Sequence, residues 1–193
     1  KTIAPKLLQE IGCQVETIND ELDECSRGPD PTSNELTDLV RKTKDLGFAF
    51  DLDSDRVILV MNGVKKSSDI TLGLGVVKAI KLGIKKFVLS IDSSLAVEKY
   101  IIQHGGEVWR SKVGEANVIQ MMIENGAGAG GEGSSGGFIL KDFNMCRDGL
   151  LTSGLIASMI DDESIQKDIE FFVSFSRTRN KIPIEPILHD KVI

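Results

Sequence analysis

The sequence predicts an α/β protein built from two consecutive subdomains. Short apolar runs typical of buried strands, such as residues 57–61 and 86–91, alternate with amphipathic stretches of helical length. The 193 residues suffice for two small domains, and 41% of them are hydrophobic, which is enough to form a core. A polar stretch, residues 62–69, separates two such alternations. We therefore expect one unit over residues 1–68 and a second over residues 69–193.

The elements of the first half follow from local signals. Apolar residues at helical spacing precede Gly12, a residue type that often ends a helix. Residues 28–31 read Gly-Pro-Asp-Pro, which bars regular structure, and the next three residues are good helix caps. In chain order we expect a helix over residues 5–11, a strand over 13–18, a loop over 19–34, a helix through about Leu46, and strands over 48–50 and 57–61.

The second half repeats the alternation of helices and strands. A buried-type strand at residues 86–91 is followed by a helix that ends at two glycines, residues 105 and 106. In chain order we expect a helix over residues 70–82, strands over 86–91 and 107–110 with a helix over 94–104 between them, a helix over 117–125, a glycine-rich loop over 126–137, a strand over 138–140, a helix near 150–159, and a strand or helix end at 168–174.

Charge and cysteine content exclude several classes of protein. Lys and Arg total 23 against 29 Asp and Glu, and the net charge of -6 opposes non-specific binding to nucleic acid or anionic lipid. No apolar run approaches the roughly 20 residues that cross a bilayer, so no membrane partner is expected. The three cysteines lack C-x-x-C spacing, which argues against a disulfide scaffold and a zinc site. No secretory leader follows Lys1, so we expect a cytoplasmic location.

Three aspartates at every second position, Asp51, Asp53 and Asp55, stand between two strand-like runs. A turn at this place can direct all three carboxylates inward. Carboxylate oxygens suit a hard cation such as Mg²⁺, and three negative charges so close together repel one another strongly without a cation. The sequence therefore predicts a Mg²⁺ site here, and a solvated acidic turn is the alternative.

Two other kinds of acidic motif can be compared with this turn. A calcium-binding EF-hand loop needs Gly at its sixth position and Glu at its twelfth, where this sequence has Arg56 and Asn62, so the EF-hand is excluded. A haloacid-dehalogenase-type phosphatase also has a strand that leads into D-x-D. That resemblance implies Asp51 as nucleophile, Asp53 as acid and Ser90 as phosphate binder.

The phosphatase alternative departs from its family's pattern at two places. Asp55 stands where that family usually has Thr or Val, and the later acidic pair at 161–162 follows a predicted helix rather than a strand. We keep the phosphatase as the second hypothesis.

A glycine-rich segment, residues 126–137, contains seven glycines in twelve positions. It satisfies G-x-G-x-x-G, but a dinucleotide site needs a strand before the motif and a helix after it, and here a helix precedes and a strand follows. Its polar side chains are Glu132, Ser134 and Ser135, and a glutamate can accept hydrogen bonds from adjacent sugar hydroxyls. The segment therefore favours a polyhydroxy ligand, with a flexible Gly/Ser linker as the alternative.

The two motifs together resemble those of the α-D-phosphohexomutase superfamily. Residues 51–56, Asp-Leu-Asp-Ser-Asp-Arg, resemble its D-x-D-x-D-R magnesium loop, and residues 131–134, Gly-Glu-Gly-Ser, resemble its G-E-x-S sugar loop. Residues 112–118 and 147–152 resemble the segments that precede and follow the sugar loop. One extra residue, Ser135, follows the sugar motif. The order of the four matches is much more specific than any one of them.

The resemblance implies a role for each matched residue. The three aspartates would bind Mg²⁺, and Arg56 would orient the reactive phosphate. Glu132 would contact sugar hydroxyls together with Ser134 or Ser135, and Lys112 would touch the substrate or its phosphate. The reaction implied for the family moves a phosphoryl group between C1 and C6 of a hexose through a bisphosphorylated intermediate.

The resemblance also implies the architecture and the missing parts. Family members have four domains, and the chain matches the second and third, which implies two consecutive three-layer α/β/α domains with mixed, mostly parallel sheets. The phosphoserine motif of the first domain and the phosphate-gripping loop of the fourth do not occur in this sequence. The expected partners are a hexose phosphate and those two domains, and the chain alone is expected to be inactive. A non-catalytic sugar-binding module is a further alternative.

Overall fold

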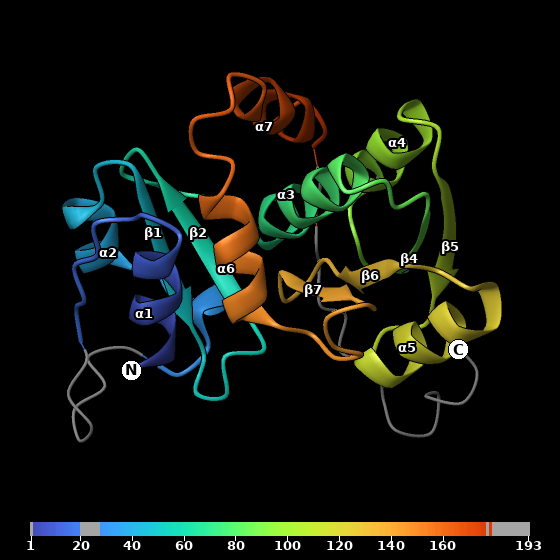
Figure 1. Cartoon of the computed structure of the whole chain (residues 1–193), viewed down its shortest axis with the longest axis horizontal. Helices are drawn as coiled ribbons and strands as arrows, with labels where there is room; N and C mark the ends of the chain where they lie inside the picture. Colours follow the sequence, from blue (N-terminus) through green and yellow to red (C-terminus); the bar gives the residue numbers. More distant parts are fainter. Residues whose placement is uncertain (1, 20–27, 177, 179–193) are drawn as a thin grey trace.

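The computed structural model describes residues 2–19, 28–176 and 178, which form an α/β fold with two separate sheets (Figure 1). The fold class predicted from the sequence is therefore confirmed. Within the described ranges, no helix has both the length and the apolar character that a bilayer span requires.

The first sheet is a three-stranded antiparallel sheet with β2 at its centre. Its order is β1-β2-β3, and β2 is buried along its whole length because helices cover both faces. Ile58 and Val60 face α2, whereas Leu59 and Met61 face α6, as the alternation of a strand requires. The elements of this half are α1 (Ile3–Glu10), a 3₁₀ turn (Pro31–Ser33), α2 (Thr37–Lys42), β1 (Leu46–Phe50), β2 (Val57–Met61) and β3 (Val64–Lys65).

The second sheet is mixed and has the order β5-β4-β6-β7. Strands β4, β5 and β6 are parallel, and β7 runs antiparallel to β6. Helices α3 and α4 pack on one face, α5 packs on the other, and α7 lies over α3 and α4. The elements are α3 (Ser68–Lys81), β4 (Lys86–Ser90), α4 (Leu95–Gln103), β5 (Glu107–Ser111), α5 (Glu115–Asn125), β6 (Ala129–Glu132), β7 (Gly137–Leu140), α6 (Gly149–Ala157) and α7 (Ile165–Val173).

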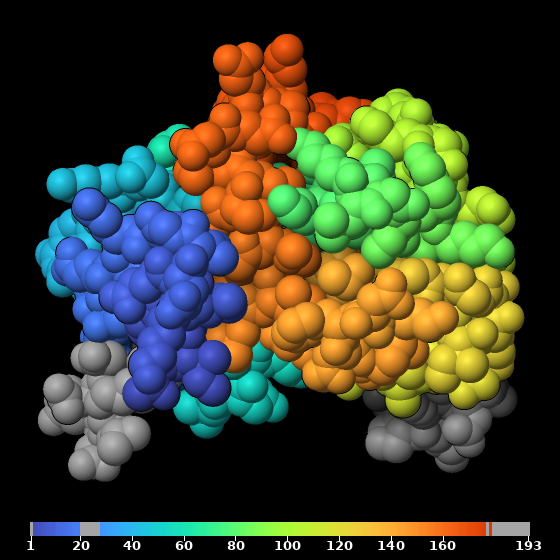
Figure 2. All heavy atoms as spheres, viewed as in Figure 1, coloured from blue at the N-terminus to red at the C-terminus, as the bar shows by residue number. Residues whose placement is uncertain are grey.

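Both sheets share one hydrophobic core. Leu59 of β2, Phe87 of β4 and Phe138 of β7 belong to the same buried cluster, together with Ile156 of α6. Helix α6 lies between α1 and α3, so its atoms fill the space between the two halves of the chain (Figure 2). The two halves are therefore held together by packing, while the division at residue 68 stays a prediction.

The parallel strands of the second sheet place polar residues at one edge. Ser90, Ser111 and Glu132 are the last residues of β4, β5 and β6. In α/β sheets the carboxyl ends of parallel strands form the edge at which ligands bind. The fold therefore directs the end of β6 toward a site.

Three expected elements differ in the structure. Residues 13–18 form no strand; Cys13, Val15 and Ile18 are half-buried, so their alternation reflects one covered side of the segment and no pairing with a strand. The helix expected through about Leu46 ends at Lys42, and Leu46 is the first residue of β1. At 168–174 the helix end, one of the two expected alternatives, is found, because α7 ends at Val173. The expected loop over 126–137 contains a strand, β6, and residues 20–27 of the other expected loop lie outside the described residues.

The glycines of β6 are explained by packing within the protein. A Cβ added at Gly130 would lie 2.7 Å from Met122 Sδ of α5 and 2.8 Å from the carbonyl oxygen of Val88 in β4. A Cβ at Gly131 would lie 2.5 Å from Leu72 Cδ1 of α3. The close approach that glycine permits here is therefore to the neighbouring helices and strand.

Candidate functional site

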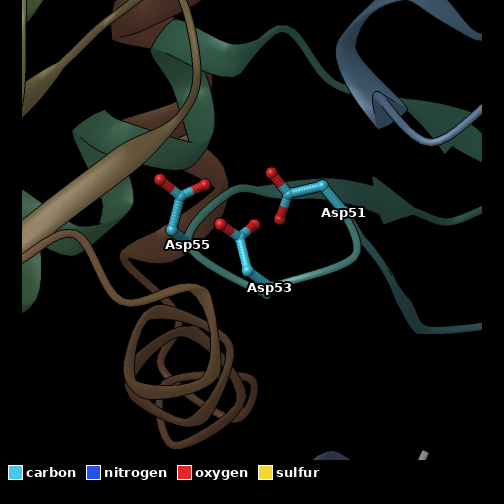
Figure 3. Close-up of side chains that lie close together, drawn as sticks. All are labelled: Asp51, Asp53 and Asp55. Atoms are coloured by element: carbon cyan, nitrogen blue, oxygen red, sulfur yellow. The ribbon is translucent and has the colours of Figure 1, made fainter.

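The six-residue turn from Asp51 to Arg56 connects β1 to β2 and is called the acidic loop below. One carboxylate oxygen from each of Asp51, Asp53 and Asp55 lies within 4.8 Å of the others, and the three side chains point toward one another (Figure 3). The backbone N–H of Arg56 donates to Asp51 Oδ1 at 3.1 Å, which closes the turn. The structure thus brings together the three predicted metal ligands.

The electrostatics of the acidic loop fit a divalent cation. The pKa of Asp51 is raised to about 6, chiefly because burial removes water, and the negative charges of Asp55 and Asp53 contribute to the rise, which the hydrogen bond from the Arg56 N–H only partly offsets. Arg56 Nε lies 3.5 Å from Asp51 Oδ2, but this buried nitrogen has no hydrogen-bond partner among the described residues. Arg56 lies near Asp51 and Asp55, whereas Asp53 has no ion pair among the described residues, and a carboxylate set of this kind is what Mg²⁺ prefers.

Arg56 has a further partner that the sequence did not indicate. Its Nη1 pairs with Asp30 Oδ2 at 3.4 Å, and Asp30 also accepts a hydrogen bond from the backbone N–H of Thr32 at 2.9 Å. The Gly-Pro-Asp-Pro segment thereby lies against the acidic loop. The sequence predicts only a loop for this segment, because nothing local reveals a partner 26 residues away.

The second motif forms a β-hairpin, residues 129–140, which is called the glycine hairpin below. Its turn is anchored at Gly133, whose N–H donates to Ser93 Oγ at 2.9 Å and whose carbonyl accepts from Ser68 Oγ at 2.6 Å. Ser135 is buried, and its hydroxyl accepts from the N–H of Gly137 at 3.2 Å. Ser134 is half-buried and has no hydrogen bond within the described part of the chain.

Glu132 is buried at the end of β6, with 3% of its surface exposed. Its Oε1 accepts from the N–H of Gly114 at 2.6 Å, and its Oε2 accepts from Arg147 Nη1 at 2.7 Å. Lys112 is exposed at the end of β5 and does not line the cleft beside Glu132. The carboxylate is therefore firmly oriented, while the lysine stands outside the cleft.

Arg147 is a site residue that sequence reasoning missed. Its Nη2 pairs with Asp55 of the acidic loop, its Nη1 donates to Glu132, and its Nε donates to Glu115 Oε2 at 2.9 Å. Burial lowers the pKa of Arg147, but the three carboxylates outweigh that effect and raise it. The segment that begins at Arg147 was matched to the family, but an isolated arginine gives no sign of three partners distant in sequence.

One residue of the acidic loop, Arg56, and three of the glycine hairpin line one cleft of about 560 Å³, whereas the three aspartates of the loop do not line it. Arg56 comes from the loop, Ser134 from the hairpin, and Arg147 joins the two. Its lining consists of Asp30, Thr32, Arg56, Val113, Gly114, Glu115, Glu132, Ser134, Ser135 and Arg147.

Comparison with known families decides the family of the chain. The family described as "Phosphoglucomutase/phosphomannomutase, alpha/beta/alpha domain III" matches residues 68–173, more than half of the sequence. The chain belongs to the α-D-phosphohexomutase superfamily.

Individual phosphohexomutases agree with this assignment. A phosphoglucosamine mutase of Campylobacter curvus is 36% identical over 171 residues, which cover 82% of this chain and 37% of the relative. That of Methanococcus vannielii is 30% identical over 205 residues, covering 99% of this chain and 46% of the relative. The chain thus spans less than half the length of these curated relatives.

A solved structure shares the fold of this phosphohexomutase chain. A phosphoglucomutase/phosphomannomutase family protein from Burkholderia thailandensis superposes with a TM-score of 0.62 at 23% identity, over 71% of this chain and 31% of that protein.

The geometry of this phosphohexomutase chain does not support the phosphatase alternative. Asp51 follows a strand of the first sheet, whereas Ser90 ends a strand of the second. The Ser90 hydroxyl is buried and donates to Asp92 Oδ1 at 2.5 Å. A nucleophile and its phosphate binder must meet at one phosphate, and these two residues belong to different sheets.

Proposed function

We propose that this chain forms the metal-binding and sugar-binding centre of a phosphohexomutase that interconverts hexose 1-phosphate and hexose 6-phosphate through a bisphosphate intermediate. The observation that carries the proposal is that Arg147 contacts both Asp55 and Glu132. Two motifs with separate chemical roles are thereby joined at one cleft, as phosphoryl transfer to and from a sugar requires.

The acidic loop would hold the metal. Asp51, Asp53 and Asp55 would bind Mg²⁺, which supplies charge neutralisation for the transferring phosphoryl group when bound. Arg56 lines the same cleft with 37% of its side chain exposed, so its guanidinium can contact a phosphate there. In this proposal Arg56 is the catalytic residue that the chain itself contributes.

The glycine hairpin would hold the sugar. Both oxygens of Glu132 already accept one hydrogen bond, and each has a second lone pair that a sugar hydroxyl can use. We assign the second sugar contact to Ser134, because its hydroxyl borders the cleft whereas that of Ser135 is committed to the hairpin turn. Lys112, outside the cleft, would meet only a distant phosphate.

The chain alone is predicted to be inactive. The phosphoserine and the second phosphate-binding loop of the family would come from other domains of a longer protein, consistent with relatives more than twice as long as the matched region. We place that protein in the cytoplasm, where its phosphorylated substrates are made. Turnover by the purified 193-residue chain would contradict this part of the proposal.

The test is phosphorus NMR of hexose 1-phosphates with Mg²⁺ and a bisphosphate primer. Glucosamine 1-phosphate is the first substrate to try, because the relatives are named phosphoglucosamine mutases; glucose and mannose 1-phosphates follow. We expect conversion to the 6-phosphate by the full-length protein and none by this chain. Release of inorganic phosphate by the chain alone would instead identify Asp51 as a nucleophile and overturn the mutase.

A further inference from the structure

Arg147 is held between carboxylates of the acidic loop and of the glycine hairpin. Its guanidinium places Nη2 on Asp55 and Nη1 on Glu132 Oε2, so the carboxylates of the acidic loop and of the glycine hairpin share one planar cation. The third contact, from Nε to Glu115 Oε2 at 2.9 Å, fixes the orientation of that plane. The two proposed ligand sites are therefore connected through a single side chain.

The backbone around Arg147 is also fixed. Its own N–H donates to Glu115 Oε2 at 3.1 Å, and the next residue, Asp148, caps α6 by accepting from the N–H of Leu151 at 2.8 Å. Only 16% of the Arg147 side chain is exposed. A side chain anchored in this way cannot relax freely when one of its partners changes, so a change at Asp55 is transmitted to Glu132.

We propose that Arg147 is a positioning residue that couples Mg²⁺ binding at the acidic loop to sugar binding at the glycine hairpin. The proposal rests on the function proposed above. When Mg²⁺ binds Asp55, that carboxylate attracts the guanidinium less, and Arg147 binds Glu132 more strongly. By linkage the reverse also holds: without the Glu132 charge, Arg147 binds Asp55 more strongly and competes with Mg²⁺.

The test is a double-mutant cycle on Mg²⁺ affinity, measured by isothermal titration calorimetry with MgCl₂ alone. The four proteins are the parent chain, Glu132→Gln, Arg147→Met and the double variant. We expect Glu132→Gln to weaken Mg²⁺ binding about fivefold in the parent background and to have no effect in the Arg147→Met background. The non-additivity is a readout that a purely structural role of Arg147 does not produce.

Two results would overturn the coupling. If Glu132→Gln weakens Mg²⁺ binding equally in both backgrounds, the effect is the direct attraction between Glu132 and the metal. If it has no effect in either background, the two sites are independent. Circular dichroism establishes that each variant folds. If Arg147→Met does not, Arg147→Lys replaces it, because lysine keeps the charge but cannot bridge two carboxylates with a planar fork.

The failure of this inference is distinguishable from failure of the proposed function. Asp53→Asn is titrated in parallel. If the parent chain does not bind Mg²⁺, or if Asp53→Asn leaves its affinity unchanged, the metal assignment itself falls. If the parent binds Mg²⁺ through Asp53 and the cycle is additive, only the role of Arg147 falls.

Discussion

The acidic loop and the glycine hairpin border the same cleft, yet they are stabilised in different ways. In the hairpin Glu132 is bonded to a backbone N–H and to Arg147, and Gly133 is anchored on both its N–H and its carbonyl. In the loop three carboxylates face one another, and the buried Nε of Arg56 has no hydrogen bond in the described structure. The hairpin is preformed, whereas the loop is suited to receive a cation.

The largest effect is expected where a glycine of the hairpin packs against both α5 and β4. Gly130→Ala should lower the free energy of unfolding by about 2–3 kcal/mol, because the new Cβ would meet a backbone carbonyl of β4 and the Met122 side chain. The matched control is Gly154→Ala in α6, where the nearest atom, Leu7 Cδ2, is 3.4 Å away. The free energy of unfolding of that variant should rise by up to about 1 kcal/mol, because alanine has a higher helix propensity than glycine.

Urea unfolding followed by circular dichroism measures both glycine variants. If Gly130→Ala were as stable as the parent chain, the tight packing of the hairpin would be wrong, and its glycines would be available to approach a ligand instead.

The second largest effect is the stabilisation by Mg²⁺, which should act through the acidic loop and not through the glycine hairpin. At Mg²⁺ concentrations about 100 times Kd, the chain should gain about 2.7 kcal/mol of stability. Asp53→Asn should remove most of this gain, because it deletes the charge of an exposed ligand. Without Mg²⁺ the variant should be no less stable than the parent, since it relieves repulsion with Asp51.

Thermal unfolding with MgCl₂ or with EDTA measures the effect of the metal. Asp142→Asn, an exposed aspartate beyond the hairpin, is the control and should keep the full gain. Equal gains in Asp53→Asn and Asp142→Asn would show that Mg²⁺ does not act through the acidic loop.

The smallest effect distinguishes the two serines of the hairpin turn. Ser135→Ala should cost about 1 kcal/mol, because the N–H of Gly137 loses its acceptor. Ser134→Ala should change stability by less than about 0.5 kcal/mol but weaken binding of hexose 6-phosphate to the full-length protein. Urea unfolding and calorimetric titration provide the two readouts, and the opposite pattern would assign the sugar contact to Ser135.

The sequence predicted the features that depend on neighbouring residues. The helices and strands that were found have clear periodicity, and the acidic loop was recognised because its three carboxylates are two residues apart. The strand β6 was missed because its glycines carry no hydrophobic pattern. Glycine is needed there because Met122, Leu72 and Val88, which belong to other elements, leave no room for a Cβ.

The parts of the site that were missed depend on distant contacts. Arg147 meets Asp55 across 92 residues, and Asp30 meets Arg56 across 26. The spacing of residues along the sequence does not predict such pairs. Only the folded chain shows that the acidic loop and the glycine hairpin are in contact through Arg147. The same reason explains why the sequence left Ser134 and Ser135 equivalent, whereas the hydrogen bonds of the hairpin separate them.

The central claim is that the acidic loop and the glycine hairpin form one site, and a crystal of the chain soaked with MnCl₂ and glucosamine 6-phosphate tests it most directly. The account predicts an anomalous peak within coordination distance of Asp51, Asp53 and Asp55, with sugar hydroxyls on Glu132 and Ser134 in the adjoining cleft. A manganese peak away from the acidic loop, or a sugar bound outside this cleft, would contradict it.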